Sequence, residues 1–182
     1  MRIDENHWLR GIRKVPSPNA DSRPDAADIV LVVLHGISLP PGRFGGACIE
    51  ELFTNRLDPA AHPSFASLDG VRVSAHLLID RRGRVTQFVP FDARAWHAGV
   101  SNWRGRQRCN DFSIGIELEG TDDRPYTRAQ YRRLVPVLRA LLGRYPRLGL
   151  DCIAGHAEIA PGRKTDPGPA FDWAGLYQRL RA

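Results

Sequence analysis

Two histidines and one aspartate are the residues of this chain whose types best suit chemistry, although they lie far apart in the sequence. His35 ends an apolar run and opens a loop rich in glycine and proline, a place where sheet proteins often carry functional side chains. His156 ends a second, shorter apolar run, and Asp166 follows it after ten residues. Two imidazoles and one carboxylate can bind a catalytic zinc ion and leave its fourth position to water. The alternative is that the histidines are structural, because no local motif ties His35 to the other two.

Glu117 and Lys164 could act beside such a site. Glu117 lies on the face opposite Ile116, in a segment with little other polarity. It is therefore either a general base that faces the water on the metal or a carboxylate paired with one of the many arginines. Lys164 lies two residues before Asp166, so its ammonium group comes near the metal if Asp166 binds one. Otherwise Lys164 is an ordinary solvated loop residue.

Motifs for other chemistries are absent. The sequence has no H-E-x-x-H, no G-x-S-x-G and no Walker loop. His156-Ala157-Glu158 matches the H-x-E of zinc deaminases, but the downstream P-C-x-x-C is missing, so Glu158 is interpreted as a solvated turn residue. Trp96 and His97 either form a wall that contacts a sugar or peptide or pack in the core.

The elements that must position these residues follow from the hydrophobic pattern. In chain order the pattern predicts a strand buried on both faces at 29–34, a short helix around 49–53, a hairpin of strands at 71–79 and 84–89, an alternating strand at 113–119, a helix at 127–145 and a last helix at about 172–180. Pro136 should kink or break the long helix, because it removes a backbone donor. A hairpin excludes a purely parallel sheet. The predicted fold class is α/β, a single domain with a central mixed β-sheet flanked by helices.

The composition is that of a globular protein of one domain. The chain has 182 residues, of which 42% are hydrophobic and 25% charged. Residues 1–28 are predicted to be an irregular lead-in packed on a domain formed by residues 29–182. No run approaches the roughly 18 apolar residues of a membrane span, and acidic residues stand where a secretory signal has its apolar core. We therefore expect a cytoplasmic protein that does not bind membranes.

The spacing of the cysteines and the distribution of charge argue against several classes of protein. The three cysteines are too scattered for a disulfide framework or a thiolate zinc ribbon, so buried free thiols are predicted. The net charge is +6, but the arginines are dispersed rather than gathered with aromatic residues. Nucleic-acid binding is therefore disfavoured, whereas acidic substrates remain open.

Five segments of the chain form longer motifs: Leu34–Gly42, Arg72–His76, Arg94–Val100, Cys109–Thr121 and Asp166–Trp173. Together they resemble the AmpD-type zinc amidases, which are cytoplasmic 1,6-anhydro-N-acetylmuramoyl-L-alanine amidases of bacterial cell-wall recycling. The resemblance runs from about residue 8 to about residue 177. It implies the type 2 amidase fold, shared with phage amidase lysozymes and peptidoglycan recognition proteins.

The resemblance also implies a role for particular residues. The family's zinc ligands fall on His35, His156 and Asp166. Its catalytic acid falls on Glu117, and its lysine that stabilises the transition state falls on Lys164. Its contacts to the substrate peptide fall on Arg72, Arg108 and Trp96. One departure is Ala47-Cys48, where the family often has an aromatic residue.

The implied function is zinc-dependent hydrolysis of the amide bond between (1,6-anhydro-)N-acetylmuramic acid and L-alanine in muropeptides. The cofactor is Zn²⁺, the partner is a small muropeptide, and a monomer is expected. Two alternatives remain: a non-catalytic peptidoglycan-binding module on the same fold, and an amidase that acts on intact murein. Zinc content and the release of free peptide separate the module from the enzyme.

Overall fold

The chain folds around a mixed sheet, as predicted. The computed structural model describes residues 1–182, and its main sheet has six strands in the order β1, β5, β4, β9, β3, β10. The parallel part comprises β4 (Leu77–Ile79), β9 (Ser113–Glu119), β3 (Leu31–Ile37) and β10 (Ile153–Gly155). The predicted hairpin is confirmed, because β5 (Val85–Gln87) runs antiparallel to β4, and β1 (Arg13–Lys14) extends that edge.

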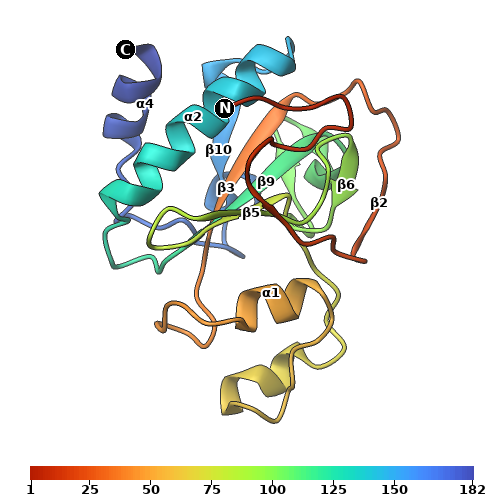
Figure 1. Ribbon diagram of the computed structural model, residues 1–182, viewed down its shortest axis with the longest axis vertical. Helices are drawn as coiled ribbons and strands as arrows, with labels where there is room; N and C mark the ends of the chain where they lie inside the picture. The colour runs from red at the N-terminus through yellow and green to blue at the C-terminus, as the bar shows by residue number, and fades with distance from the viewer.

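Two helices, α2 (Arg128–Arg144) and α4 (Trp173–Arg181), pack on one face of the sheet (Figure 1). Ile114, Ile116 and Leu118 alternate along β9 and belong to the same core cluster as the apolar side chains of α2. Because successive residues of a strand point to opposite faces, Gly115 and Glu117 face the other side. The alternation in β9 is therefore confirmed residue by residue.

The long helix begins as the sequence predicts. The Thr127 hydroxyl accepts a hydrogen bond from Gln130 N at 3.1 Å, and the Gln130 side chain accepts one from Thr127 N at 2.9 Å. The helix continues through Pro136, so the predicted break does not occur. Buried side chains on both sides of the proline, Leu134 and Leu138 among them, hold the helix against the sheet and offset the lost backbone bond.

Strand β3 is buried on both faces, as its continuous apolar run predicts. Val32 and Leu34 belong to the main core, whereas Leu31 and Val33 belong to a smaller cluster on the opposite face. His35 continues the second set, so its imidazole lies on the face that carries Glu117.

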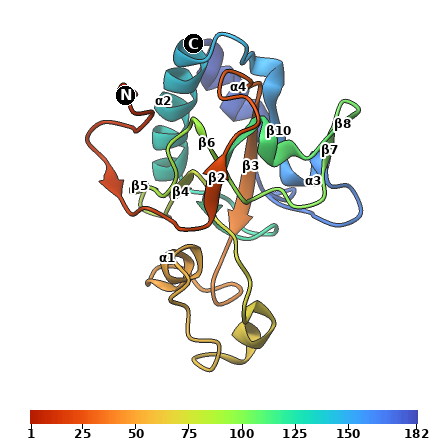
Figure 2. The same cartoon turned by 90° about the vertical axis from the view of Figure 1, so that its right-hand side faces the viewer.

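Short elements surround this face. The predicted short helix is confirmed as α1 (Cys48–Phe53). The structure adds α3 (His156–Ile159), the strand pairs β2 (Ala20–Ser22) with β6 (Ala93–Ala95) and β7 (Asn102–Trp103) with β8 (Arg106–Gln107), and 3₁₀ turns at Pro63–Leu68, Cys109–Asp111 and Leu150–Cys152. In Figure 2, α1 and the 3₁₀ turn that follows it lie beyond the end of β3, below the sheet. None of the helices combines the length and the apolar character needed to cross a bilayer.

The N-terminal 28 residues lie against the rest of the chain and contribute β1 and β2. Arg23 anchors them, because the residue is 7% exposed and its guanidinium donates to the carbonyl oxygens of Phe91, Asn110 and Ser113 at 2.7–3.2 Å. A buried arginine with several carbonyl partners ties distant loops together.

Three local predictions were wrong. Only 77–79 of the predicted strand 71–79 is a strand, because Ser74 N bonds to Trp96 O and this segment packs on the loop that follows β6. Glu158 is exposed but lies in α3, where it accepts a hydrogen bond from Gly155 N. All three cysteines are free, yet only Cys109 is buried, since Cys48 and Cys152 sit on short elements at the surface.

Candidate metal centre

Strand register places the first pair of functional side chains. His35 on β3 lies directly beside Glu117 on β9, and Gly155 at the end of β10 lies beside Leu34. His156 therefore begins α3 at the same edge of the sheet as His35. The carboxyl ends of neighbouring parallel strands meet at one edge, which is where such folds place ligands.

Asp166 reaches this edge from a loop that the backbone holds in place. Asp166 O accepts a hydrogen bond from Ala157 N at 2.9 Å, and its carboxylate accepts one from Gly36 N at 3.3 Å. Gly36 is required here, because a Cβ at that position would lie 2.3 Å from the Tyr126 hydroxyl. A glycine directly after His35 thus makes room for the Tyr126 hydroxyl, which donates to Pro167 O at 3.0 Å beside Asp166.

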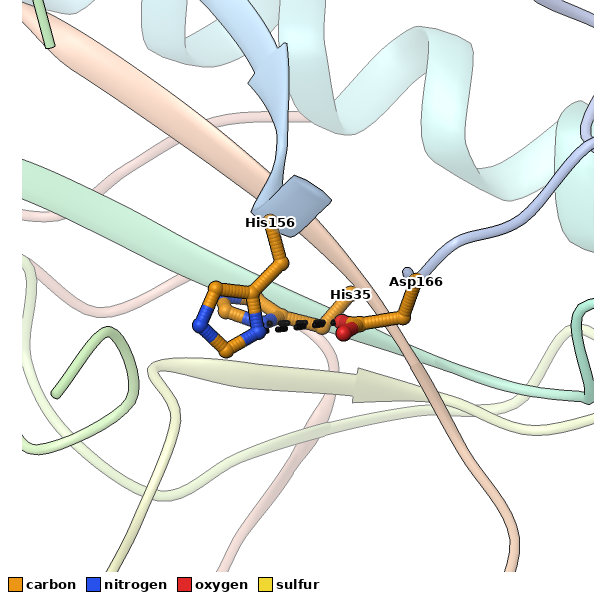
Figure 3. Close-up of side chains that lie close together, drawn as sticks. All are labelled: His35, His156 and Asp166. Carbon is orange, nitrogen blue, oxygen red and sulfur yellow. Dashed lines mark hydrogen bonds and ion pairs between the residues drawn. The ribbon is translucent and has the colours of Figure 1, made fainter. Parts of the chain in front are cut away.

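The three predicted ligands converge (Figure 3). His35 Nδ1 lies 2.9 Å from His156 Nδ1, and Asp166 Oδ2 lies 3.4 Å from His35 Nδ1 and 3.1 Å from His156 Nδ1. Donor atoms placed about 2.0–2.1 Å from a tetrahedral zinc ion are about 3.3 Å apart. The three separations therefore fit one zinc ion.

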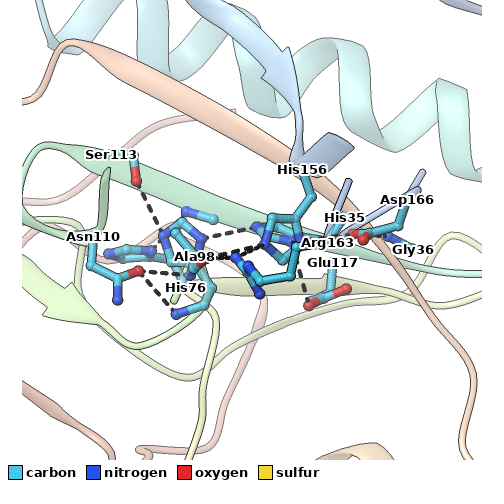
Figure 4. Close-up of polar contacts among 12 residues, drawn as sticks. His35, Gly36, His76, Ala98, Asn110, Ser113, Glu117, His156, Arg163 and Asp166 are labelled. Carbon is cyan, nitrogen blue, oxygen red and sulfur yellow. Dashed lines mark hydrogen bonds and ion pairs between the residues drawn. The ribbon is translucent and has the colours of Figure 1, made fainter. Parts of the chain in front are cut away.

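The other ring nitrogens have partners of their own, whereas both Nδ1 atoms face each other and Asp166, where an ion would lie (Figure 4). His156 Nε2 lies 3.2 Å from Ala98 O and donates its proton there, because a carbonyl can only accept. His35 Nε2 lies 2.9 Å from His97 Nδ1. Arg163 donates to the same Ala98 carbonyl at 2.6 Å. Partners of this kind orient metal-binding imidazoles.

The electrostatics favour the protonation states that a metal requires. Burial lowers the pKa of His35 to about 4, against the opposing hydrogen bond with Asp166. Burial raises the pKa of Asp166, but the hydrogen bonds with His156 and His35 outweigh it, so its pKa lies well below the usual range. At neutral pH the site thus offers a neutral imidazole and a carboxylate, as metal binding requires.

Glu117 is a carboxylate without an arginine partner. Its Oε1 lies 4.0 Å from His35 Nδ1, and its buried Oε2 has no hydrogen-bond partner. Burial and the nearby Asp166 raise the pKa of Glu117 well above its usual range, and Lys164 opposes them. Of the two interpretations of Glu117, the pairing with an arginine is therefore wrong. A carboxylate in this setting suits proton transfer.

Lys164 and Trp96 line the same hollow as the three ligands and Glu117, which has a volume of about 190 Å³. Trp96 is half-buried at its wall, and Lys164 is exposed at its rim. Arg72 and Arg108 are also exposed but line other hollows. Arg72 adjoins Val73, which lines the site, whereas Arg108 forms an ion pair with Asp111 at 3.3 Å.

Three residues support the ligands in a way that the sequence did not indicate, including His97, which was expected only as a wall or core residue. His97 contacts His35, Arg163 fixes the Ala98 carbonyl, and Asn110 Oδ1 accepts hydrogen bonds from the backbone of His97 and Ala98 at 3.1 and 2.8 Å. These residues lie in loops without periodicity. The only indication in the sequence was that His97 and Asn110 both lie within segments that resemble the amidases.

Comparison with known proteins identifies the class to which this fold and site belong. The family model for N-acetylmuramoyl-L-alanine amidase matches residues 25–169, so the chain belongs to that family. Within the family it is of the AmpD type. The 1,6-anhydro-N-acetylmuramyl-L-alanine amidase AmpD of Enterobacter cloacae is 60% identical over 176 residues, which are 97% of this chain and 94% of the relative. The same-named protein of Escherichia coli K12 is 61% identical over 93% of this chain and 92% of its own length.

Solved structures agree with the fold. A crystal structure of a selenomethionine AmpD derivative is 58% identical and superposes with a TM-score of 0.93, covering 100% of this chain and 98% of the other. The AmiD amidase of Escherichia coli, in complex with anhydro-N-acetylmuramic acid-L-Ala-D-gamma-Glu-L-Lys, is 29% identical with a TM-score of 0.62, over 97% of this chain and 62% of the other.

Proposed function

We propose that the chain hydrolyses the amide bond between 1,6-anhydro-N-acetylmuramic acid and L-alanine in muropeptides. The observation that carries the proposal is the convergence of three metal-ligand atoms and an unpartnered carboxylate in one hollow. Its relatives named AmpD are called amidases of this substrate class.

His35, His156 and Asp166 would hold a zinc ion through His35 Nδ1, His156 Nδ1 and Asp166 Oδ2. When bound, zinc lowers the pKa of water to about 7 and polarises a carbonyl oxygen. The three side chains carry one formal negative charge in total, so a site that holds Zn²⁺ would keep a net positive charge.

Glu117 is the general base and acid. Its free Oε2 accepts the proton of the attacking water and returns it to the alanine amine as the amide bond breaks. Burial supports this role, because a carboxylate with a raised pKa gains a proton more readily than an ordinary glutamate does.

Lys164 stabilises the negative charge that develops on the former carbonyl oxygen. Lys164 is among the residues that line the hollow, and its positive charge acts on Glu117 and His35. A cation placed where charge develops lowers the barrier, because it binds the transition state more tightly than the substrate.

The remaining contacts would select the substrate. Trp96 would pack against the substrate along the wall of the hollow, and Arg72 and Arg108 would bind peptide carboxylates in fork geometry. The net charge of +6 suits an acidic muropeptide. We further propose that the protein acts as a monomer in cytoplasmic peptidoglycan recycling.

Mass spectrometry of an anhydromuropeptide incubated with the protein tests the function. We expect free peptide and anhydro-N-acetylmuramic acid from the zinc-loaded protein and uncleaved substrate from chelator-stripped protein. Tight binding without cleavage would favour the non-catalytic module instead. Faster cleavage of intact murein than of the anhydromuropeptide would favour the alternative amidase.

A further inference from the structure

His97 lies beside a metal-ligating histidine without being a ligand itself. Its Nδ1 is 2.9 Å from His35 Nε2, and its Nε2 is 3.2 Å from Ser113 Oγ. The two rings meet edge to face, with centroids 4.9 Å apart. His97 therefore links the ligand to a hydroxyl at the start of β9.

The backbone around His97 is fixed on both sides of the ring. His97 N and Ala98 N both donate to Asn110 Oδ1, the fork visible beside Asn110 in Figure 4. Ala98 O in turn accepts from His156 Nε2 at 3.2 Å. One loop thus contacts the outer nitrogen of both metal-ligating imidazoles.

Gly115 makes room for the His97 ring. A Cβ at position 115 would lie 2.4 Å from His97 Cγ, which no real contact allows, so the ring could not keep its place. Gly115 has no positive φ, so an alanine fits its backbone. A methyl group at position 115 would therefore displace His97 without touching a ligand.

The direction of the hydrogen bond between His97 and His35 determines which nitrogen of His35 carries the proton. A neutral imidazole carries one proton, on either Nδ1 or Nε2. His35 can present a lone pair from Nδ1 only when its proton sits on Nε2, and that proton then needs an acceptor. His97 Nδ1 occupies this position, and His97 Nε2 can donate onward to Ser113 Oγ.

We propose that His97 is a positioning residue, which holds His35 in the tautomer that binds metal by accepting the proton of His35 Nε2. The inference rests on the proposed zinc site but on no step of the proposed reaction. It predicts that loss of the acceptor weakens zinc binding, even though His35, His156 and Asp166 are all intact.

Competition with a chromophoric chelator, which reports the zinc dissociation constant, tests the proposal. We expect His97→Leu, which keeps the volume but removes the acceptor, to weaken zinc binding by about 10- to 100-fold. His97→Asn places an amide oxygen close to the position of Nδ1 and should restore most of the affinity. Gly115→Ala, which moves the imidazole instead of removing it, should weaken zinc binding as well.

Gly143→Ala is the matched control. Gly143 lies in α2, and a Cβ there meets nothing within 4 Å, so this variant should bind zinc as tightly as the parent. Thermal unfolding of the metal-free proteins separates positioning from folding. A purely structural role would lower the unfolding midpoint of His97→Leu and leave its zinc affinity unchanged.

Two results would overturn the proposal: parent-like zinc affinity in both His97→Leu and Gly115→Ala, or equal losses in His97→Asn and His97→Leu. A ¹⁵N NMR spectrum of the zinc-loaded parent adds an independent readout, in which the proton must reside on His35 Nε2. The outcome is separable from the proposed function. A protein that binds zinc but cleaves no muropeptide refutes the function and leaves the affinity test of His97 valid.

Discussion

Replacement of Glu117 by glutamine tests the role of the unpartnered carboxylate. The change keeps the shape of a side chain that is 12% exposed but removes its ability to take a proton. A positioned general base typically contributes a factor of 10² to 10⁴ in rate. We therefore expect kcat/KM for anhydromuropeptide hydrolysis to fall by about 100- to 10,000-fold, or about 2.7 to 5.5 kcal/mol in the barrier.

The same variant should keep its zinc and its fold. Glu117 Oε1 lies 4.0 Å from His35 Nδ1 and is outside the converging ligand set. Because burial and Asp166 disfavour the charged carboxylate, the neutral amide should not lower the unfolding midpoint. The assay is kcat/KM together with zinc analysis of the purified protein, with Glu5→Gln, an exposed carboxylate far along the chain, as the control. A Glu117→Gln protein within about tenfold of parent activity would refute the general-base assignment.

Three further outcomes follow from the site. Lys164→Ala should slow turnover by about 100- to 1,000-fold with zinc retained, and near-normal turnover of this variant would exclude the charge-stabilising role. Lys164→Arg should restore turnover only in part. Asp166→Ala and His156→Ala should lose zinc as well as activity, and metal analysis that finds parent zinc content in both would remove them from the ligand set. Burial and the adjacent Arg23 hold the pKa of His76 well below 6.5, so the folded residue stays neutral while the unfolded chain gains a proton. The contribution of neutral His76 to the free energy of unfolding is thus complete above pH 6.5. It is lost as the pH falls below 6.5, by at most about 1.4 kcal/mol per pH unit. Urea unfolding at several pH values should therefore show that the free energy of unfolding depends less steeply on pH in His76→Gln than in the parent.

The sheet, and the face of it that carries Glu117, could be predicted because the local sequence carries their signal. The alternation of Ile114, Ile116 and Leu118 determines which side chains of β9 face the core, and it alone sends Glu117 to the other face. The start of α2 was predictable for a similar reason, since Thr127 satisfies backbone donors within its own turn. Such features depend on neighbours in the chain.

The residues that hold the metal ligands in place could not be predicted, because their positions depend on contacts between distant segments. His97 lies 62 residues from His35 in the sequence, and its place depends on the absence of a side chain at Gly115. The contacts of Arg23 could not be predicted either, because its carbonyl partners lie 68 to 90 residues away in the sequence. Neither residue has a periodic pattern around it, and a lone histidine or arginine in a loop indicates solvent exposure by default.

The central claim is that three side chains from distant parts of the chain bind one zinc ion. A crystal structure of the protein grown with zinc tests it most directly. We expect one ion bound by His35 Nδ1, His156 Nδ1 and Asp166 Oδ2 at about 2.0–2.2 Å, with Glu117 outside its coordination shell. An ion held by other residues, or these three side chains too far apart to share one, would contradict it.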